Sequence, residues 1–246
     1  ELPIAVNQDA NKMERLQRMI RPFILRRLKG DVLKDLPEKI EENVFARLDG
    51  EQMQLYDAYA TRMKEMLSQQ NEKEFHKGRM QILSELTKLR QLCCDPGLLL
   101  EDYHGESAKT DMCMELIVNA VGAGHKILLF SQFTSMLDRL TERLKKEGID
   151  YYLLTGSVNK EKRMQMVESF NNDDVPVFCI SLKAGGTGLN LTSADIVIHY
   201  DPWWNVAVQN QATDRAHRIG QKHVVTVYKL VAEGTIEEKI IDIQER

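Results

Sequence analysis

Residues 175–190 read VPVFCISLKAGGTGLN, an apolar run that ends in a glycine-rich turn. A short, continuously apolar run is typical of a strand that helices cover on both faces of a parallel sheet. Four similar runs lie at 126–131, 151–154, 196–200 and 224–230. Helical patterns separate or follow these runs, at 108–121, 133–147, 159–170, 206–217 and 235–244. The alternation predicts an α/β fold with a doubly wound parallel sheet.

The first 105 residues follow a different, mostly helical pattern. Apolar residues recur at helical spacing in 15–28, from Asp49 onward and in 72–92, and Asp95-Pro96-Gly97 marks the end of the last of these helices. The stretch 40–46 has the composition of a strand. We therefore expect a helical region ahead of the main sheet, with the boundary near residue 105.

The composition limits the class of protein. The chain has 246 residues, of which 43% are hydrophobic and 28% charged, and its net charge is −4. These values exclude a disordered tail, a collagen-like rod and a disulfide-rich miniprotein. No apolar run approaches the roughly 20 residues of a membrane span. The four cysteines lack C-x-x-C spacing, so we expect reduced thiols and no zinc site.

The glycine-rich turn is the first candidate site. Three glycines in four positions (185–188) let backbone N–H groups approach a phosphate or a ribose closely. A tight connection without a ligand is the alternative. The turn is not a P-loop, because the pattern G-x-x-x-x-G-K-[ST] occurs nowhere in the chain.

The second candidate is the segment QATDRAHRIGQ at 211–221. If the segment is helical, Gln211, Arg215 and Arg218 project from one face, because they are spaced by four and three residues. Such a face presents guanidinium forks to phosphate oxygens. The plainer interpretation is a surface ion pair between Asp214 and Arg218.

Two further loops carry residues suited to nucleic acid. HYDPWWN at 199–205 places adjacent tryptophans at a strand end, where one is expected to anchor the loop and the other to be exposed for contact with nucleic acid. LTGS at 154–157 precedes a helix with Lys160, Lys162 and Arg163, which is compatible with an anion site. A structural loop and an ordinary capped helix are the respective alternatives.

Taken in order, these motifs resemble the carboxyl-terminal helicase lobe of SWI/SNF-type ATPases, which are superfamily two DNA translocases. FSQF at 130–133 belongs to the set, and the upstream stretches PFILRR at 22–27, LPEK at 36–39 and LRQLC at 89–93 are similar to the same family. The resemblance implies a RecA-like doubly wound parallel sheet lobe with an N-terminal helical insertion. It divides the chain into an interlobe linker leading into the lobe (1–48), a helical protrusion (49–105) and the RecA-like C-terminal lobe (106–246).

The resemblance also implies roles for individual residues. Arg215 and Arg218 would contact the ATP phosphates as catalytic arginines, with Arg218 the finger. Gln211, Gly188 and Asn190 would line the nucleotide side. The residues that would face the DNA backbone are Ser131, Gln132, Gly156, Lys183, Thr187 and Trp204. Mg²⁺ would accompany ATP and would be held by the N-terminal lobe, and no metal ligand is expected in this chain.

The motifs of that N-terminal lobe, a P-loop lysine and an acidic pair, do not occur in the chain. We therefore expect a soluble segment of a longer protein, inactive alone, whose partners are double-stranded DNA and the N-terminal lobe of the same polypeptide. We expect a monomeric motor without a membrane partner, cytoplasmic and nucleoid-associated in a bacterium or nuclear in a eukaryote. The alternatives are a non-catalytic α/β module that binds nucleic acid or protein, and a Rossmann-like enzyme, which the late position of the glycines disfavours.

Overall fold

The computed structural model describes residues 36–69, 72–184 and 188–245. The chain divides into two compact units, Glu1–Leu36 and Pro37–Arg246, and nearly all the described residues belong to the second unit. The helical pattern at 15–28 and the residue Thr187 lie outside the described residues. Within the described residues, no helix is both long enough and apolar enough to cross a membrane.

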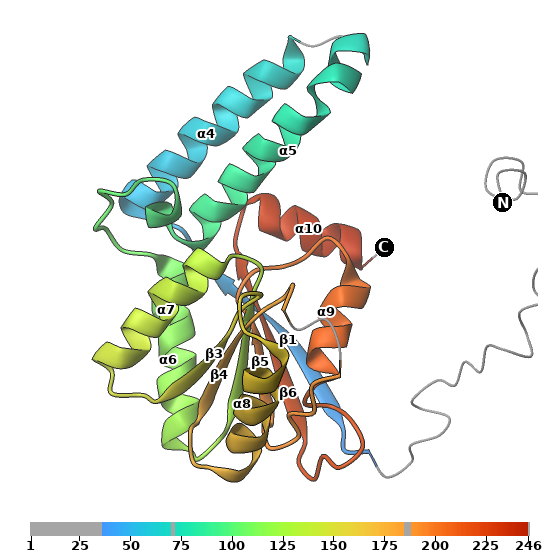
Figure 1. Ribbon diagram of the computed structural model, residues 1–246. Helices are drawn as coiled ribbons and strands as arrows, with labels where there is room; N and C mark the ends of the chain where they lie inside the picture. The colour runs from blue at the N-terminus through green and yellow to red at the C-terminus, as the bar shows by residue number, and fades with distance from the viewer. Residues whose placement is uncertain (1–35, 70–71, 185–187, 246) are drawn as a thin grey trace, which may run out of the picture. The chain divides into compact units, whose positions relative to one another are not determined.

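A six-stranded sheet forms the centre of the second unit, and all its neighbouring strands pair in parallel. The strand order is β1-β6-β5-β2-β4-β3 (Figure 1). The strands are β1 (Lys39–Ala46), β2 (Ile127–Ser131), β3 (Tyr151–Leu154), β4 (Val177–Ser181), β5 (Ile196–His199) and β6 (Val225–Ala232). Every residue of β2, β4 and β5 is buried. The predicted doubly wound parallel sheet is confirmed, and burial on both faces explains the unbroken apolar runs.

Helices cover the two faces of the sheet, α6 (Ala108–Gly122) and α7 (Thr134–Lys146) on one side, α8 (Lys160–Asn172) and α9 (Val206–Thr213) on the other (Figure 1). Alternate residues of β2 face the two layers. Leu129 packs in the core with the residues of α6 and α7, whereas Leu128 packs with those of α8 and α9. The period-two alternation of a strand therefore divides the interior into two apolar cores.

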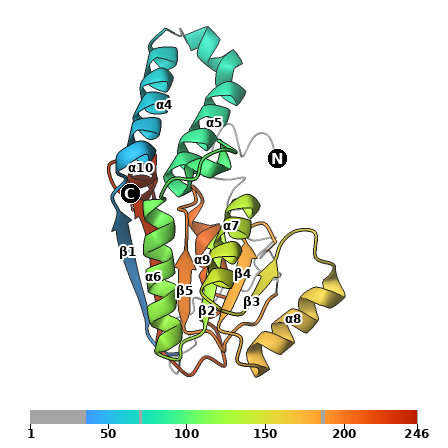
Figure 2. The ribbon, with the colours of Figure 1, turned by 90° about the vertical axis from the view of Figure 1, so that its left-hand side faces the viewer.

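A helical hairpin of α4 (Gly50–Ser68) and α5 (Glu72–Cys94) projects from the end of the sheet where the strands finish (Figure 2). Its base is held by a third apolar core, in which Tyr56 and Leu89 of the hairpin pack with Ala232 of β6. The last helix, α10 (Ile236–Gln244), contacts both α5 and β6. A short 3-10 helix, η2 (Pro96–Leu98), follows α5.

The strand expected at 40–46 is confirmed as β1, which pairs with β6 from Lys39 opposite Val225 to Ala46 opposite Ala232. One difference concerns the helix expected at 206–217, which ends at Thr213. Its continuation is lost because the N–H of Arg215 bonds the carbonyl of Ala212, three residues back, and the carbonyl of Arg215 accepts from the N–H of Leu191. Residues 214–220 therefore form turns instead of a helical face.

Candidate functional site

Four of the sequence motifs lie at the edge of the sheet where the parallel strands end. FSQF spans the end of β2, LTGS begins at the last residue of β3, the glycine turn (184–190) follows β4, and HYDPWWN begins at the last residue of β5. Ligands of doubly wound sheets bind at this carboxyl edge. The topology alone thus brings together four loops that are up to about 70 residues apart in the chain. The hydrogen bond between Ser131 and Asp201 joins two of these loops.

The arginine segment lies directly against the glycine turn. Nη1 of Arg218 donates to the carbonyl oxygen of Leu189 at 3.5 Å, and the N–H of Leu191 donates to the carbonyl of Arg215 at 3.0 Å. Gly188 has a positive φ of 75°, a conformation that favours glycine. The predicted neighbourhood of arginines and glycine turn is therefore present, although a turn and not a helix presents the arginines.

The two arginines differ in exposure. The side chain of Arg215 is almost buried, with 6% of its surface exposed, whereas Arg218 is exposed. Burial lowers the pKa of Arg215, and the nearby charge of Arg218 lowers it further, against the opposing effect of Asp214. Two like charges close together favour the binding of an anion, since it relieves their repulsion.

The remaining predicted nucleotide residues, Gln211 and Asn190, both have exposed surface. Gln211 is exposed in the last turn of α9, and Asn190 is exposed while its carbonyl accepts from Nδ2 of Asn171 at 2.7 Å. A groove of about 670 Å³ separates α8 from residues 188–190. Lys160 and Arg163 of α8 line it, together with the apolar side chains of Met164, Val167 and Leu189.

Ser131 is a correction to the predicted DNA-facing set. Its side chain has no exposed surface, and its hydroxyl donates to Oδ1 of Asp201 at 2.5 Å while it accepts from the N–H of Phe133. The N–H of Gln132 also points to Asp201, at 3.3 Å. Ser131 therefore supports the loop from inside, because its hydroxyl bonds Asp201 and the backbone of Phe133.

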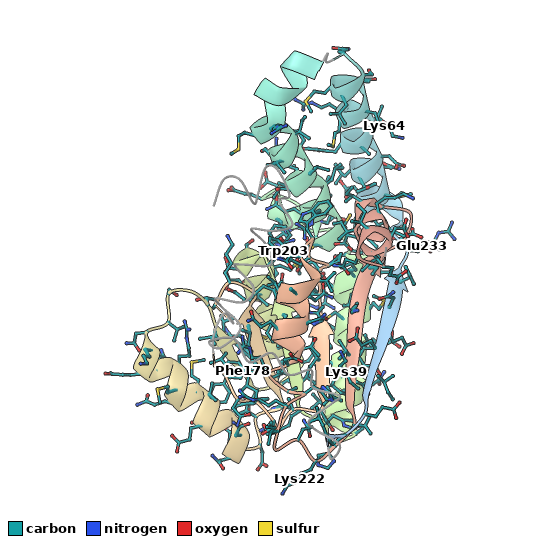
Figure 3. All side chains as sticks on the ribbon, turned by 90° about the vertical axis from the view of Figure 1, so that its right-hand side faces the viewer. Lys39, Lys64, Phe178, Trp203, Lys222 and Glu233 are labelled. Atoms are coloured by element: carbon teal, nitrogen blue, oxygen red, sulfur yellow. The ribbon has the colours of Figure 1, made fainter. Side chains whose placement is uncertain are left out.

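The adjacent tryptophans separate as expected. Trp203 is half-buried and packs against the core beneath α8 and α9, whereas Trp204 is 41% exposed. Trp203 lies near the base of the α4–α5 hairpin, while Lys222 marks the opposite end of the lobe (Figure 3). Oε1 of Gln209 accepts from the N–H of Trp203 at 3.3 Å, and Nε2 of Gln244 donates to its carbonyl. One ring thus anchors the loop and leaves the other available to a ligand.

Of the other predicted DNA-facing residues, Gln132 is half-buried, and Gly156 and Lys183 are exposed. Three loops of the carboxyl edge therefore each contribute one solvent-accessible side chain, from Gln132, Lys183 and Trp204. Gly156 lies in the fourth loop. Within the described residues, no three or more His, Cys, Asp and Glu side chains come together as a metal site.

Sequence reasoning missed the residues that hold these loops from below. Arg90 of α5, 3% exposed, donates to Oε1 of Gln132 and to the carbonyl of Pro202. Lys109 and Glu237, both without exposed surface, form an ion pair nearby. Burial raises the pKa of Asp201, and the charges of Lys109 and Arg90 oppose this rise. In the sequence, Arg90 was noted only as part of LRQLC, a stretch to which no function was assigned.

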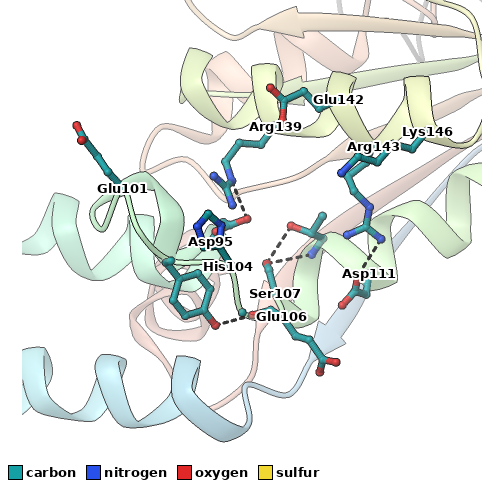
Figure 4. A pocket seen from close by; sticks show the side chains of 13 residues that line it. Asp95, Glu101, His104, Glu106, Ser107, Asp111, Arg139, Glu142, Arg143 and Lys146 are labelled. Atoms are coloured by element: carbon teal, nitrogen blue, oxygen red, sulfur yellow. Dashed lines mark hydrogen bonds and ion pairs between the residues drawn. The ribbon is translucent and has the colours of Figure 1, made fainter.

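A second hollow, of about 530 Å³, lies between the α5–α6 connection and α7 (Figure 4). Its main cations are paired across it, Arg139 with Asp95 at 2.9 Å and Arg143 with Asp111 at 3.0 Å. None of the predicted site residues lines it. The hollow is therefore separate from the loops of the carboxyl edge.

Comparisons with known proteins agree with this arrangement. The Helicase conserved C-terminal domain matches residues 108–220, and the SNF2-related domain matches residues 1–98. The chain is 35% identical to the Sulfolobus solfataricus SWI2/SNF2 ATPase C-terminal domain, with a TM-score of 0.70 over 85% of this chain and 86% of that one. The structure of the same organism's SWI2/SNF2 ATPase core in complex with dsDNA is 37% identical, with a TM-score of 0.73 over 94% of this chain and 49% of that one.

Curated relatives from other organisms are also similar. The chain is 42% identical to the putative ATP-dependent helicase/translocase YwqA of Bacillus subtilis, over 97% of this chain and 26% of the relative. It is 43% identical to an uncharacterized ATP-dependent helicase of Mycoplasma pneumoniae, over 91% of this chain and 21% of the relative. The chain thus spans about a fifth to a quarter of the length of the curated relatives it matches.

Proposed function

The chain belongs to the SWI2/SNF2 family of helicase-like ATPases, and from this premise we propose that it is the second RecA-like lobe of an ATP-dependent motor that moves along double-stranded DNA. The observation that carries the proposal is the contact of Arg218 with the glycine turn, beside the buried Arg215. This contact places two cations beside residues 188–191, which follow the glycine-rich turn and which, in this proposal, face the nucleotide shared with a first lobe.

In this proposal the first lobe holds ATP and Mg²⁺, and this chain completes the site from across a cleft. Arg218, the more exposed of the two arginines, reaches the transferring phosphoryl group as the finger. Arg215 is held rigidly by burial and adds its charge from behind. Gln211, Gly188 and Asn190 line the nucleotide side. The chemistry that this lobe supplies is the neutralisation of developing negative charge, worth about 10³–10⁵ in rate in related systems.

The DNA side of the proposal uses the loops at the carboxyl edge of the sheet. In this proposal Gln132, Gly156, Lys183 and Trp204 meet the DNA backbone, and Thr187 completes the set. Because these groups suit phosphates and sugars, binding should be steeply salt-dependent and nearly blind to sequence. The similarity to a SWI2/SNF2 ATPase core in complex with dsDNA supports the choice of partner.

The test is an ATPase assay on the chain joined to a first lobe that carries a P-loop. We expect Arg218→Ala to lower DNA-stimulated turnover by about 10³-fold or more and to leave duplex binding without nucleotide unchanged. Arg62→Ala, which removes an exposed arginine of α4, is the matched control and should retain full turnover. The chain without a first lobe should hydrolyse no ATP.

Three results would contradict the proposal. Near-normal turnover of the Arg218→Ala enzyme would remove the finger role. Robust hydrolysis by the 246-residue chain alone would show that phosphate and metal are held within it. If the two-lobed protein binds duplex DNA but never hydrolyses ATP, the lobe is a binding module and not part of a motor.

A further inference from the structure

Arg90 connects the helical hairpin to two loops of the carboxyl edge. It lies in the last turns of α5, and its side chain is almost fully buried, with 3% of the residue exposed. An arginine is rarely buried to this extent unless its charge and its donors are satisfied. Two of its nitrogens, Nη1 and Nη2, are satisfied by groups from loops 131–133 and 201–204, which are 42 and 112 residues away in the chain, whereas Nε has no hydrogen-bond partner within the described residues.

The guanidinium contacts each loop with a different nitrogen. Nη1 donates to Oε1 of Gln132 at 2.9 Å, and Nη2 donates to the carbonyl oxygen of Pro202 at 2.6 Å. The carboxylate of Asp201 lies 3.8 Å from Nη2. A planar fork with fixed donor directions therefore sets the distance between the two loops, which a single rotating ammonium group does not do.

Aromatic rings from the same two loops enclose the guanidinium. Its central carbon lies 5.8 Å from the ring centre of Phe133 and 5.5 Å from those of Trp203 and Trp204. These distances are within the range of cation–π attraction, which is stronger for a desolvated cation. The ring of Trp204, which the proposed function turns toward DNA, is thus held on its inner side by Arg90.

We propose that Arg90 is a positioning residue for DNA engagement: it fixes loops 131–133 and 201–204 in one mutual arrangement, so that Gln132 and Trp204 meet the same duplex together. The inference rests on the proposed function for its DNA part. Its structural part, the holding of the two loops, stands on the contacts alone. Because Arg90 belongs to α5, it also makes the hairpin a mechanical support of the DNA-facing surface.

The chain contains a built-in reporter for this arrangement. Its only two tryptophans are Trp203 and Trp204, so intrinsic tryptophan fluorescence comes entirely from the loop that Arg90 holds. The first measurement is acrylamide quenching of this fluorescence in the folded chain, with Arg90→Met and Arg90→Lys compared with the unsubstituted protein. The second is affinity for a short duplex of arbitrary sequence, measured by fluorescence anisotropy.

We expect Arg90→Met to make the tryptophans more accessible to acrylamide and to weaken duplex binding about tenfold, as the loss of charge-assisted hydrogen bonds implies. Arg90→Lys should resemble Arg90→Met more than the unsubstituted chain, because its charge is kept but its fork is lost. Should Arg90→Met fail to fold, Arg90→Lys provides both measurements.

Two controls separate positioning from general destabilisation. Ile82→Ala removes a buried side chain from the same helix, in the core of the hairpin, and should lower the melting temperature without changing quenching or duplex affinity. Arg62→Met on α4 should change none of the three quantities.

Unchanged quenching and unchanged affinity in both Arg90 variants would overturn the proposal. So would an Ile82→Ala chain with the same losses, since the effect would then be general. If the unsubstituted chain binds no duplex, the proposed DNA function and the DNA part of this inference fail together. The quenching measurements still decide separately whether Arg90 holds the loops.

Discussion

The buried ion pair between Lys109 and Glu237 predicts a large and specific loss of stability when one partner is removed. Neither residue has exposed surface. Nζ of Lys109 lies 2.8 Å from both carboxylate oxygens of Glu237, and one of these oxygens also accepts from the N–H of Ala232 at 2.9 Å. The pair joins α6 to α10, so it holds the last helix on the lobe.

The protonation state of Lys109 follows from the geometry of this pair. Burial lowers the pKa of Lys109, but the attraction of Glu237 prevails and raises it above its ordinary value, so the ammonium stays protonated. Nζ also lies 4.9 Å from the ring centre of Tyr200, a second favourable contact for a cation. Lys109→Met removes this cation and leaves a carboxylate buried without its partner.

The expected cost of Lys109→Met is about 3–5 kcal/mol in the free energy of unfolding. For a chain of this size this corresponds to a fall in Tm of roughly 10 °C. Glu237→Gln should cost a similar amount, since it leaves the cation buried, while its amide oxygen still accepts from Ala232. The double variant should cost about 2–3 kcal/mol less than the sum of the two single losses, because two neutral side chains of similar volume need no charge compensation.

Urea unfolding at neutral pH, followed by far-UV circular dichroism, measures all four corners of this double-mutant cycle. We expect a coupling free energy of about 2–3 kcal/mol between the two positions. If each single variant costs less than about 1 kcal/mol, or if the two losses simply add, the pair is not a buried charge contact of the kind described. The reasoning on how α10 is held would then be wrong.

Three further predictions concern single residues. Burial lowers the pKa of His199 from 6.5 to about 3, so the folded state resists protonation of this side chain. The free energy of unfolding should therefore fall by about 2 kcal/mol between pH 7 and pH 5, where the unfolded state takes up the proton. Urea unfolding of His199→Gln should show a smaller difference in this free energy between the two pH values. Burial raises the pKa of Glu41, but hydrogen bonds and charge attraction from Lys229 and Lys39 prevail and lower it from 4.5 to about 2. The ionised carboxylate therefore stabilises the fold above about pH 4.5, and this stabilisation is lost toward pH 2. We expect Glu41→Gln to reduce the difference in Tm between pH 5 and pH 3. Arg215→Lys in the two-lobed protein should lower turnover by about 10²-fold or more, because a point charge does not replace a planar fork, and retention of turnover would show that charge alone is sufficient.

Local patterns in the chain were enough to predict most of the fold. The apolar runs at β2, β4 and β5 read as buried strands because helices on both faces bury every position. The helix starts expected near residues 159 and 206 are confirmed, and the structure adds that the side chains of Asn159 and Asn205 accept from backbone N–H groups there. The separate roles of the two tryptophans followed from their adjacency.

The arrangement of the site was predicted only in part. The proximity of Arg218 to the glycine turn was expected and is present. The helical presentation of Arg215 was not confirmed, because its carbonyl bonds Leu191 instead of continuing α9, and this competition comes from a distant loop. Ser131 was wrongly expected at the surface, since a strand's last residue reveals its facing only when its neighbours are known.

The amino-acid sequence by itself therefore determined the strands, the helices and the loops that carry charge or glycine, because these depend on periodicity and on neighbours within a few residues. The tertiary structure alone decided what joins those loops. Arg90 meets Pro202 across 112 residues, and Lys109 meets Glu237 across 128. Such contacts leave no periodic trace, because a buried charge is defined by the partners that folding brings to it and not by the residues beside it in the chain.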